Sequence, residues 1–282
     1  LFSAGKVLAA AMLCAFASGA QETDAMKLPA QLAGAFAITA LCTRDVSSMI
    51  GLARETVTKI SNFTALLLPV LSSSLAASGG SVSAGALLAG GSFAMSLLTK
   101  LASVLIPLVY VYILLSAAEC ATDGGGLGKI RALGGRAISL LIKGLCAVFT
   151  AYLSLSRVLT GSADAFALKA AQAAFSGMVP VVGSMLSDAS ESLLASAGLI
   201  RSAAGAFGIL AVISMAIMPF LRLGAFYLAL KIAGAIGDGA VMKPHAALLS
   251  NLASAMGYML AIAASALWMS LVSAACFLKA VS

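Results

Sequence analysis

Charged residues are scarce in this sequence, and their scarcity excludes an ordinary water-soluble domain. Only 10% of the 282 residues are charged and 61% are hydrophobic, with a mean hydropathy of +1.08. Globular domains carry about 25% charged residues, so this chain lacks the polar surface that a soluble fold needs. Its apolar runs of about 20 residues are continuous rather than alternating, which favours membrane-crossing helices over a β-barrel. The composition predicts an all-α, polytopic transmembrane helical bundle of about six to eight spans.

Residues that carry enzyme chemistry are also few. The single histidine, His245, follows a proline, and the five cysteines include no Cys-x-x-Cys pair. Serine triads, zinc sites and imidazole acid–base catalysis therefore have at most one candidate side chain each. The ten acidic residues lie at the ends of apolar runs or in polar stretches. Even the close pair Asp188 and Glu191 is more typical of a polar helix surface than of paired catalytic carboxylates. We expect no enzymatic activity, no cofactor and no metal site.

The basic residues are more numerous but dispersed. Seventeen Lys and Arg residues contribute to a net charge of +7 and are scattered between the apolar runs. Nucleic acid is therefore not an expected partner, because its recognition needs a clustered basic face. These residues are suited instead to orienting the spans and to contacting the anionic headgroups of membrane lipids. The glycine run Asp123–Gly128 lacks the Gly-Lys-Ser/Thr ending of a phosphate-binding loop, so nucleotide binding is not predicted.

The amino-terminal part divides into two predicted regions. Residues 1–27 are typical of a signal-like segment or of a first span with its loop; we favour the span, and the leading Leu1 indicates a fragment. Residues 28–62 hold a second span and then an amphipathic helix, which lies at the headgroup boundary or lines a polar path in a bundle. We favour the first position. The apolar residues that recur at helical spacing in this helix are Val46, Ile50, Ala53, Val57 and Ile60.

Two proline-containing segments interrupt the apolar pattern. Phe175–Asp188 is apolar but contains Pro180 between two glycines, and Phe63–Ala77, with Pro69, is too short for a full crossing. Proline removes a backbone donor, and interrupted backbone persists at membrane depth only where protein or a watery cavity satisfies its polar groups. We predict two broken, re-entrant Pro-Val hairpins, with a simple kink as the alternative. The candidate pathway or hairpin residues are Pro69, Pro180, Val181, Val182, Gly183, Asp188 and Lys143.

The segments between the two hairpins leave further alternatives open. Residues 82–118 form either a tight hairpin or one helix that continues through Lys100. Glu119–Arg136, which is rich in glycine and basic residues, is predicted to be a loop. Lys143 lies inside the next apolar run, Ala137–Ser156, where a lysine either snorkels towards the interface or faces a polar interior. Because Arg136 is only about two turns away, we favour snorkelling.

The proline positions also predict an internal repeat. Pro69 and Pro180 lie about 111 residues apart, and the helix-break candidates Pro107 and Pro219 are separated by a nearly equal interval. Residues 63–161 and 162–282 would then be two membrane repeat halves, and paired interrupted helices in two halves indicate a pathway at the membrane midplane. Coincidence is the alternative, because Ala, Leu, Ser and Gly dominate the sequence and align easily.

Several separated motifs, in order, resemble the stage III sporulation protein AE family. The resemblance covers essentially residues 28 to 275. One departure is Arg201-Ser202, where that family usually has a Lys-Asn pair, so no role is carried over to these two positions. The segments that carry the resemblance are Leu67–Leu71, Ala76–Gly80, Asp164–Lys169, Phe175–Gly183, Leu186–Ala189 and Leu199–Gly208.

This resemblance implies a multi-pass protein of the mother-cell membrane in a sporulating bacterium. The family belongs to the stage III A complex, which joins the stage II Q protein to connect mother cell and forespore and includes a separate cytoplasmic ATPase. The chain would be the permease-like, channel-forming core subunit of this secretion-like assembly. Other stage III A proteins, including the ATPase component, would be its partners, with the stage II Q protein an indirect one. The alternative is a stand-alone secondary transporter with a pathway between inverted repeats.

Overall fold

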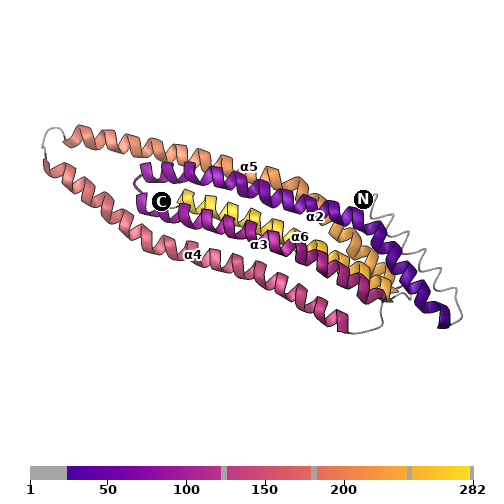
Figure 1. Ribbon diagram of the computed structural model, residues 1–282. Helices are drawn as coiled ribbons and strands as arrows, with labels where there is room; N and C mark the ends of the chain where they lie inside the picture. The colour runs from indigo at the N-terminus through magenta and orange to yellow at the C-terminus, as the bar shows by residue number, and fades with distance from the viewer. Residues whose placement is uncertain (1–23, 122–125, 179–182, 240–242, 280–282) are drawn as a thin grey trace. The chain divides into compact units, whose positions relative to one another are not determined.

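The computed structural model describes the backbone of residues 24–121, 126–178, 183–239 and 243–279. Its side chains are described for most of 40–120, 126–156, 196–236 and 246–278. These residues form long α-helices joined by short connections (Figure 1). The helices are α2 (Asp24–Ala77), α3 (Ser81–Ala121), α4 (Gly126–Met178), α5 (Gly183–Gly239) and α6 (Lys243–Lys279).

Each of these helices contains a stretch that is long and apolar enough to cross a membrane. About 20 residues suffice for a crossing, whereas the helices have 37 to 57 residues. The five stretches in the described residues are Arg44–Ala77, Ser81–Cys120, Gly126–Ser156, Gly198–Ile236 and Ala246–Leu278. The prediction of an all-α membrane bundle is confirmed. The predicted first span within residues 1–27 lies almost entirely outside the described residues, so the count of six to eight stays a prediction.

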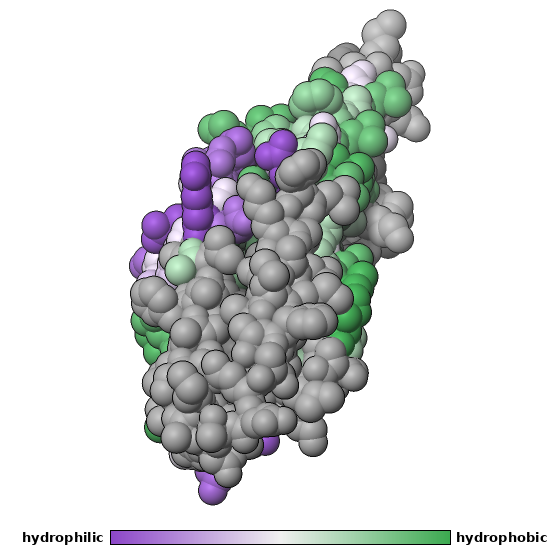
Figure 2. Space-filling view, turned by 90° about the vertical axis from the view of Figure 1, so that its right-hand side faces the viewer, coloured by the Kyte–Doolittle hydropathy of each residue, from purple (hydrophilic) through white to green (hydrophobic). Residues whose placement is uncertain are grey.

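Apolar side chains remain on the outside of these helices, as expected of a chain surrounded by lipid. Figure 2 shows one face, on which hydrophobic residues cover much of the described surface and hydrophilic ones gather mainly in one patch. Leu140 is 72% exposed, and Phe207 and Leu210 are each 67% exposed. Side chains of this size are usually buried in water-soluble proteins, and a bilayer stabilises their exposure on the outside of a helical protein.

The predicted break at Pro69 is absent and that prediction was wrong, whereas kinks at Pro107 and Pro219 stay predictions. Pro69 lies inside α2, Pro107 inside α3 and Pro219 inside α5, and each helix continues on both sides of its proline. Phe63–Ala77 is therefore the end of a 54-residue helix rather than a separate half-helix. The physical reason is that a proline removes one N–H from a ladder with many other hydrogen bonds, and helices in a membrane tolerate that loss.

The helices also continue through most of the polar stretches that were predicted to end them. α3 runs through Lys100, so the single-helix alternative for residues 82–118 is the correct one. The predicted loop Glu119–Arg136 is wrong for most of its length, since α3 ends at Ala121 and α4 begins at Gly126. Charged side chains on the surface of a helix and glycines within it do not force the backbone out of the helical conformation. The hydrogen bonds that maintain a helix join its own backbone groups and do not involve these side chains.

The chain divides into two compact units, each drawn from three stretches of sequence. Unit 1 contains residues 1–57, 101–143 and 217–264, and unit 2 contains residues 58–100, 144–216 and 265–282. These units do not coincide with the predicted halves 63–161 and 162–282. The internal repeat and the domain boundaries at 27 and 62 stay predictions.

Unit 1 has a core whose α2 face was predicted from periodicity. Val46, Ile50, Ala53 and Val57 are each at most 3% exposed, while Arg54 on another face is exposed. This confirms the amphipathic pattern but places it in the middle of α2 rather than in a separate helix. Apolar residues of the other four helices complete the core of this unit; they include Leu105, Val109, Ile138, Leu223, Leu230, Leu252 and Met256.

In unit 2, hydroxyl contacts add to an apolar core that includes Leu68, Leu71 and Phe277. A turn with Gly79 at φ 94° joins α2 to α3, and just beyond it Ser72 Oγ donates to the Ala84 carbonyl at 3.2 Å. Positive φ of this kind favours glycine. Thr64 Oγ1 and Ser270 Oγ, on α2 and α6, lie 2.7 Å apart. Close packing at small residues and hydroxyl hydrogen bonds are how helices associate where the hydrophobic effect is absent.

Candidate functional site

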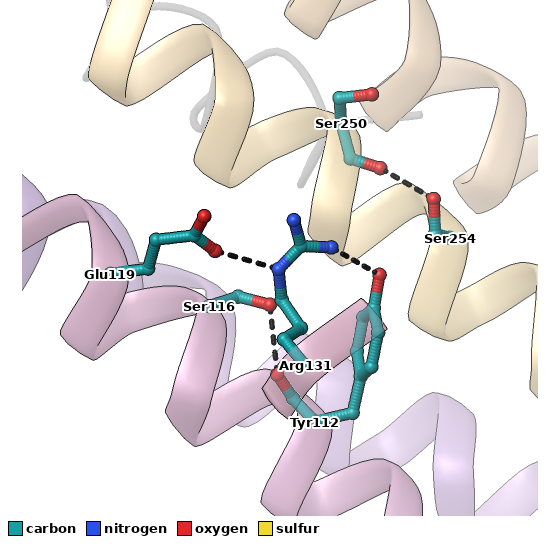
Figure 3. A network of polar contacts seen from close by, with 6 residues as sticks. All are labelled: Tyr112, Ser116, Glu119, Arg131, Ser250 and Ser254. Atoms are coloured by element: carbon teal, nitrogen blue, oxygen red, sulfur yellow. Dashed lines mark hydrogen bonds and ion pairs between the residues drawn. The ribbon is translucent and has the colours of Figure 1, made fainter. Parts of the chain in front are cut away.

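The most polar cluster that the structure describes lies in unit 1, where α3, α4 and α6 meet. On α3, Tyr112, Ser116 and Glu119 are spaced four and three residues apart and so share one face. Tyr112 is only 4% exposed, and Ser116 Oγ donates to the Tyr112 carbonyl at 2.8 Å. The hydroxyl of Ser116 is therefore satisfied within its own helix, and the tyrosine hydroxyl and the carboxylate remain for partners on α4 (Figure 3).

Arg131 of α4 is the centre of this cluster. Its Nε donates to Glu119 Oε2 at 2.7 Å, and its Nη1 donates to Tyr112 Oη at 3.0 Å (Figure 3). The guanidinium carbon also lies 5.6 Å from the centroid of the Tyr112 ring. The two charged side chains are 20% and 31% exposed, so the pair is partly shielded from solvent. A charged side chain in a membrane-length helix is costly unless it is paired and hydrogen-bonded, as Arg131 and Glu119 are.

Two glycines of α4 make room for this arrangement. A Cβ on Gly128 would collide with the Glu119 carboxylate, and a Cβ on Gly135 would lie 2.5 Å from Tyr258 Oη and 3.3 Å from Tyr112 Cε2. The rings of Tyr112 and Tyr258 pack edge to face, with centroids 5.4 Å apart. Gly135 thus allows the α6 tyrosine to reach the α3 tyrosine across α4.

These side chains border an open cavity of about 380 Å³. Its size is within the range of small-molecule sites, roughly 300–1,000 Å³. Among the described residues, three cations and no carboxylate line it, and Glu119, outside the lining, bonds to Arg131. The lining residues are Tyr112, Arg131, Ala132, Gly135, Arg136, Ser139, Leu140, Lys143 and Tyr258. We call this the basic cavity.

A comparison with known proteins places the chain in a family. The family model described as stage III sporulation protein AE matches residues 5–280. The chain belongs to the stage III sporulation protein AE family. Stage III sporulation protein AE of Bacillus subtilis (strain 168) is 27% identical over 191 residues, which are 66% of this chain and 47% of that protein. The chain thus spans about half the length of this curated relative. No solved structure shows significant similarity.

The structure places only some of the sequence-predicted site residues in this member of the family. Lys143 lies in the basic cavity with Arg131 and Arg136. Pro69 belongs to unit 2 and is exposed on α2, away from any helix break. Gly183 is the first residue of α5, and Asp188 lies in the turns that follow; the surroundings of both residues lie outside what the structure describes. The remaining candidates, Pro180, Val181 and Val182, lie outside the described residues.

The cluster around Arg131 was missed from the sequence because its residues fall in or beside the predicted loop Glu119–Arg136. Helical spacing was the available signal. Tyr112, Ser116 and Glu119 lie on one face of a helix if α3 is continued to Ala121, and Arg131, Gly135 and Ser139 lie on one face if α4 begins before them. Among the residues that the structure describes, no group of three metal-binding side chains is present.

Proposed function

We propose that this chain is the integral membrane core subunit of a multiprotein, secretion-like complex that links mother cell and forespore during endospore formation. The observation that carries this proposal is the family match over residues 5–280, a range that also contains five membrane-length helices. A family member that is embedded in the membrane along most of its length is suited to form the membrane part of an assembly. The mother-cell membrane is the location that this function requires.

A permease-like, channel-forming role is supported by polar groups within the membrane-length helices. In unit 1, Arg131 and Glu119 form an ion pair beside a cavity with two further cations. In unit 2, Thr64 and Ser270 hydrogen-bond inside the core, and Ser273 is 2% exposed with no partner for its hydroxyl among the described residues. Charged and polar side chains in membrane-length helices are rare, and they commonly mark substrate or ion pathways.

The proposed partners are the other stage III A proteins, including the cytoplasmic ATPase component, and indirectly the stage II Q protein. The chain has no Gly-Lys-Ser/Thr phosphate-binding loop in its sequence. Energy for transport would therefore come from the ATPase partner or from an ion gradient. In this proposal the chain itself performs no enzymatic reaction and holds no cofactor.

Isolation of the tagged protein from sporulating cells in a mild detergent tests this proposal. We expect an ATPase and single-span membrane partners to co-purify with it, as judged by mass spectrometry. An unrelated polytopic membrane protein with the same tag, isolated in parallel, is the control for non-specific recovery. Recovery of the chain alone at stages when its proposed partners are present in the membrane would contradict the core-subunit role.

A stand-alone secondary transporter is the second candidate, and one observation favours it. Arg136 and Lys143, both in the membrane-length stretch of α4, line the basic cavity of about 380 Å³. Cations at such a position are what a site for an anionic solute would require. Uptake of organic anions into liposomes that contain only the purified chain is the distinguishing measurement. Saturable uptake that Lys143→Gln abolishes would favour the transporter over the core subunit.

A further inference from the structure

Two of the three cations in the basic cavity have no anionic partner among the described residues. Arg131 is bonded to Glu119, but no ion pair is present at Arg136 or Lys143 in the described part of the chain. These two side chains are seven residues apart on α4 and therefore lie on the same face of the helix. The cavity thus presents a local excess of positive charge and attracts an anion.

The neighbouring donors suit the oxygens of a phosphate. Arg131 has five N–H donors, of which Glu119 Oε2 and Tyr112 Oη take two in the recorded bonds. Ser139 adds a hydroxyl to the same wall of the cavity. Arginine and lysine around a phosphate form charge-assisted hydrogen bonds, which are about twice as strong as neutral ones. A phosphate-bearing anion is therefore the ligand whose chemistry this cavity fits.

The surface beside the cavity distinguishes a lipid from a soluble phosphate. Leu140 lines the cavity and is 72% exposed, and Leu133, two turns earlier on the same side of the helix, is 63% exposed. A soluble phosphate makes no favourable contact with these apolar side chains, whereas the acyl chains of a phospholipid would cover them. Cations and apolar surface are thus adjacent, as an anionic phospholipid requires.

The length of α4 is compatible with a headgroup at this position. The membrane-length stretch Gly126–Ser156 has 31 residues, about 46 Å as a straight α-helix, against a hydrocarbon core of about 30 Å. Part of this stretch must lie outside the hydrocarbon. Arg131 and Arg136 are within about 15 Å of its amino-terminal end, and the flexible stem of Lys143 allows its charge to reach the same level.

We propose that the basic cavity binds the phosphate of an anionic phospholipid, with Arg136 and Lys143 as its principal contacts. Arg131, held by Glu119 and Tyr112, supplies further donors, and Leu140 packs against an acyl chain. Basic pockets between membrane helices bind anionic headgroups in this way. The site would let an anionic lipid stabilise the contact of α3, α4 and α6, whether or not the chain assembles with other sporulation proteins.

Native mass spectrometry of the purified full chain in detergent tests this proposal by titration with dioleoyl phosphatidylglycerol, using dioleoyl phosphatidylcholine as the zwitterionic reference. Arg136→Gln/Lys143→Gln is the test variant. Arg44→Gln/Arg222→Gln is the matched control, because it also removes two exposed cations from unit 1 but neither lines the cavity. At about 1 kcal/mol per basic residue, the test variant should bind phosphatidylglycerol about 30-fold more weakly.

The expected pattern is selective binding of phosphatidylglycerol by the wild type and by the control variant. The swap Arg136→Lys/Lys143→Arg, which preserves both charges, should retain most of this binding. Equal losses in the test and control variants would overturn the proposal, because they would show a bulk charge effect. Equal affinity of the wild type for both lipids would also overturn it. Displacement of the lipid by an equal concentration of inorganic phosphate would assign the cavity to a soluble anion instead.

Discussion

Two adjacent glycines of α4 provide a sharp test of the geometry around the basic cavity. Gly135 is buried, and a Cβ there would lie 2.5 Å from Tyr258 Oη and 3.3 Å from Tyr112 Cε2. A Cβ on Gly134 would have no heavy atom within 4 Å other than those of its chain neighbours and its own helix backbone. Gly134→Ala and Gly135→Ala therefore add the same methyl group at adjacent positions, but only the methyl group at position 135 displaces the tyrosine pair.

The expected difference follows from three contributions. Both substitutions gain up to about 1 kcal/mol because alanine favours the helix over glycine. Only Gly135→Ala forces the Tyr258 ring aside, which costs about 0.5–1.5 kcal/mol of aromatic contact with Tyr112. Overpacking adds roughly 1–3 kcal/mol where the neighbours do not relax fully. Because the helix-propensity gain is common to both variants, we expect Gly135→Ala to be less stable than Gly134→Ala by about 1.5–4.5 kcal/mol, which corresponds to a melting temperature lower by several degrees.

Thermal unfolding in detergent can be followed with a maleimide dye that fluoresces when it reacts with cysteines. Cys42, Cys120 and Cys276 are buried and become accessible as the protein unfolds. Tyr258→Phe in the Gly135→Ala background removes the hydroxyl that lies closest and should restore part of the lost stability, as a double-mutant cycle would record. Equal melting temperatures for the two alanine variants would refute the predicted contact between Gly135 and the tyrosine pair.

Two further predictions concern other contacts of unit 1. A Cβ on Gly234 of α5 would lie 3.2 Å from the backbone nitrogen of Ser250 on α6, whereas a Cβ on Gly224 would face open space. Gly234→Ala should therefore have a lower melting temperature than Gly224→Ala. The reverse order would exclude a close approach of these helices. Glu119→Gln should destabilise the protein by no more than about 1 kcal/mol, because the pair with Arg131 is partly exposed; the loss should shrink at high salt, and a salt-independent loss would indicate that the charge is not its cause.

Composition and periodicity were sufficient for the class of the protein and for part of its core. A chain with 10% charged residues has no soluble fold available, so the prediction of membrane helices needed no tertiary information. The buried face of α2 that contains Val46, Ile50, Ala53 and Val57 followed from helical spacing alone. Such a pattern is local, because residues three or four apart share one face whatever they pack against.

The positions of the helix ends were predicted poorly. Pro69, Pro107, Pro219 and the glycine-rich stretch after Glu119 carry the local signals of a break, yet the helices continue through the prolines and resume at Gly126. A proline or glycine in the sequence indicates only a local free-energy penalty, from one lost hydrogen bond or one flexible residue. Whether the helix bears that cost depends on the many hydrogen bonds and packing contacts on either side, which no local pattern contains.

The sequence by itself determined that this is a helical membrane protein, that it resembles the stage III sporulation protein AE family, and which face of α2 is buried. Only the tertiary structure decided that Glu119, Arg131, Tyr112 and Tyr258 meet beside Lys143. These residues come from three helices, and 146 positions separate Tyr112 from Tyr258. Their contact depends on how the helices pack, and in particular on Gly135, whose missing side chain allows the two tyrosines to touch.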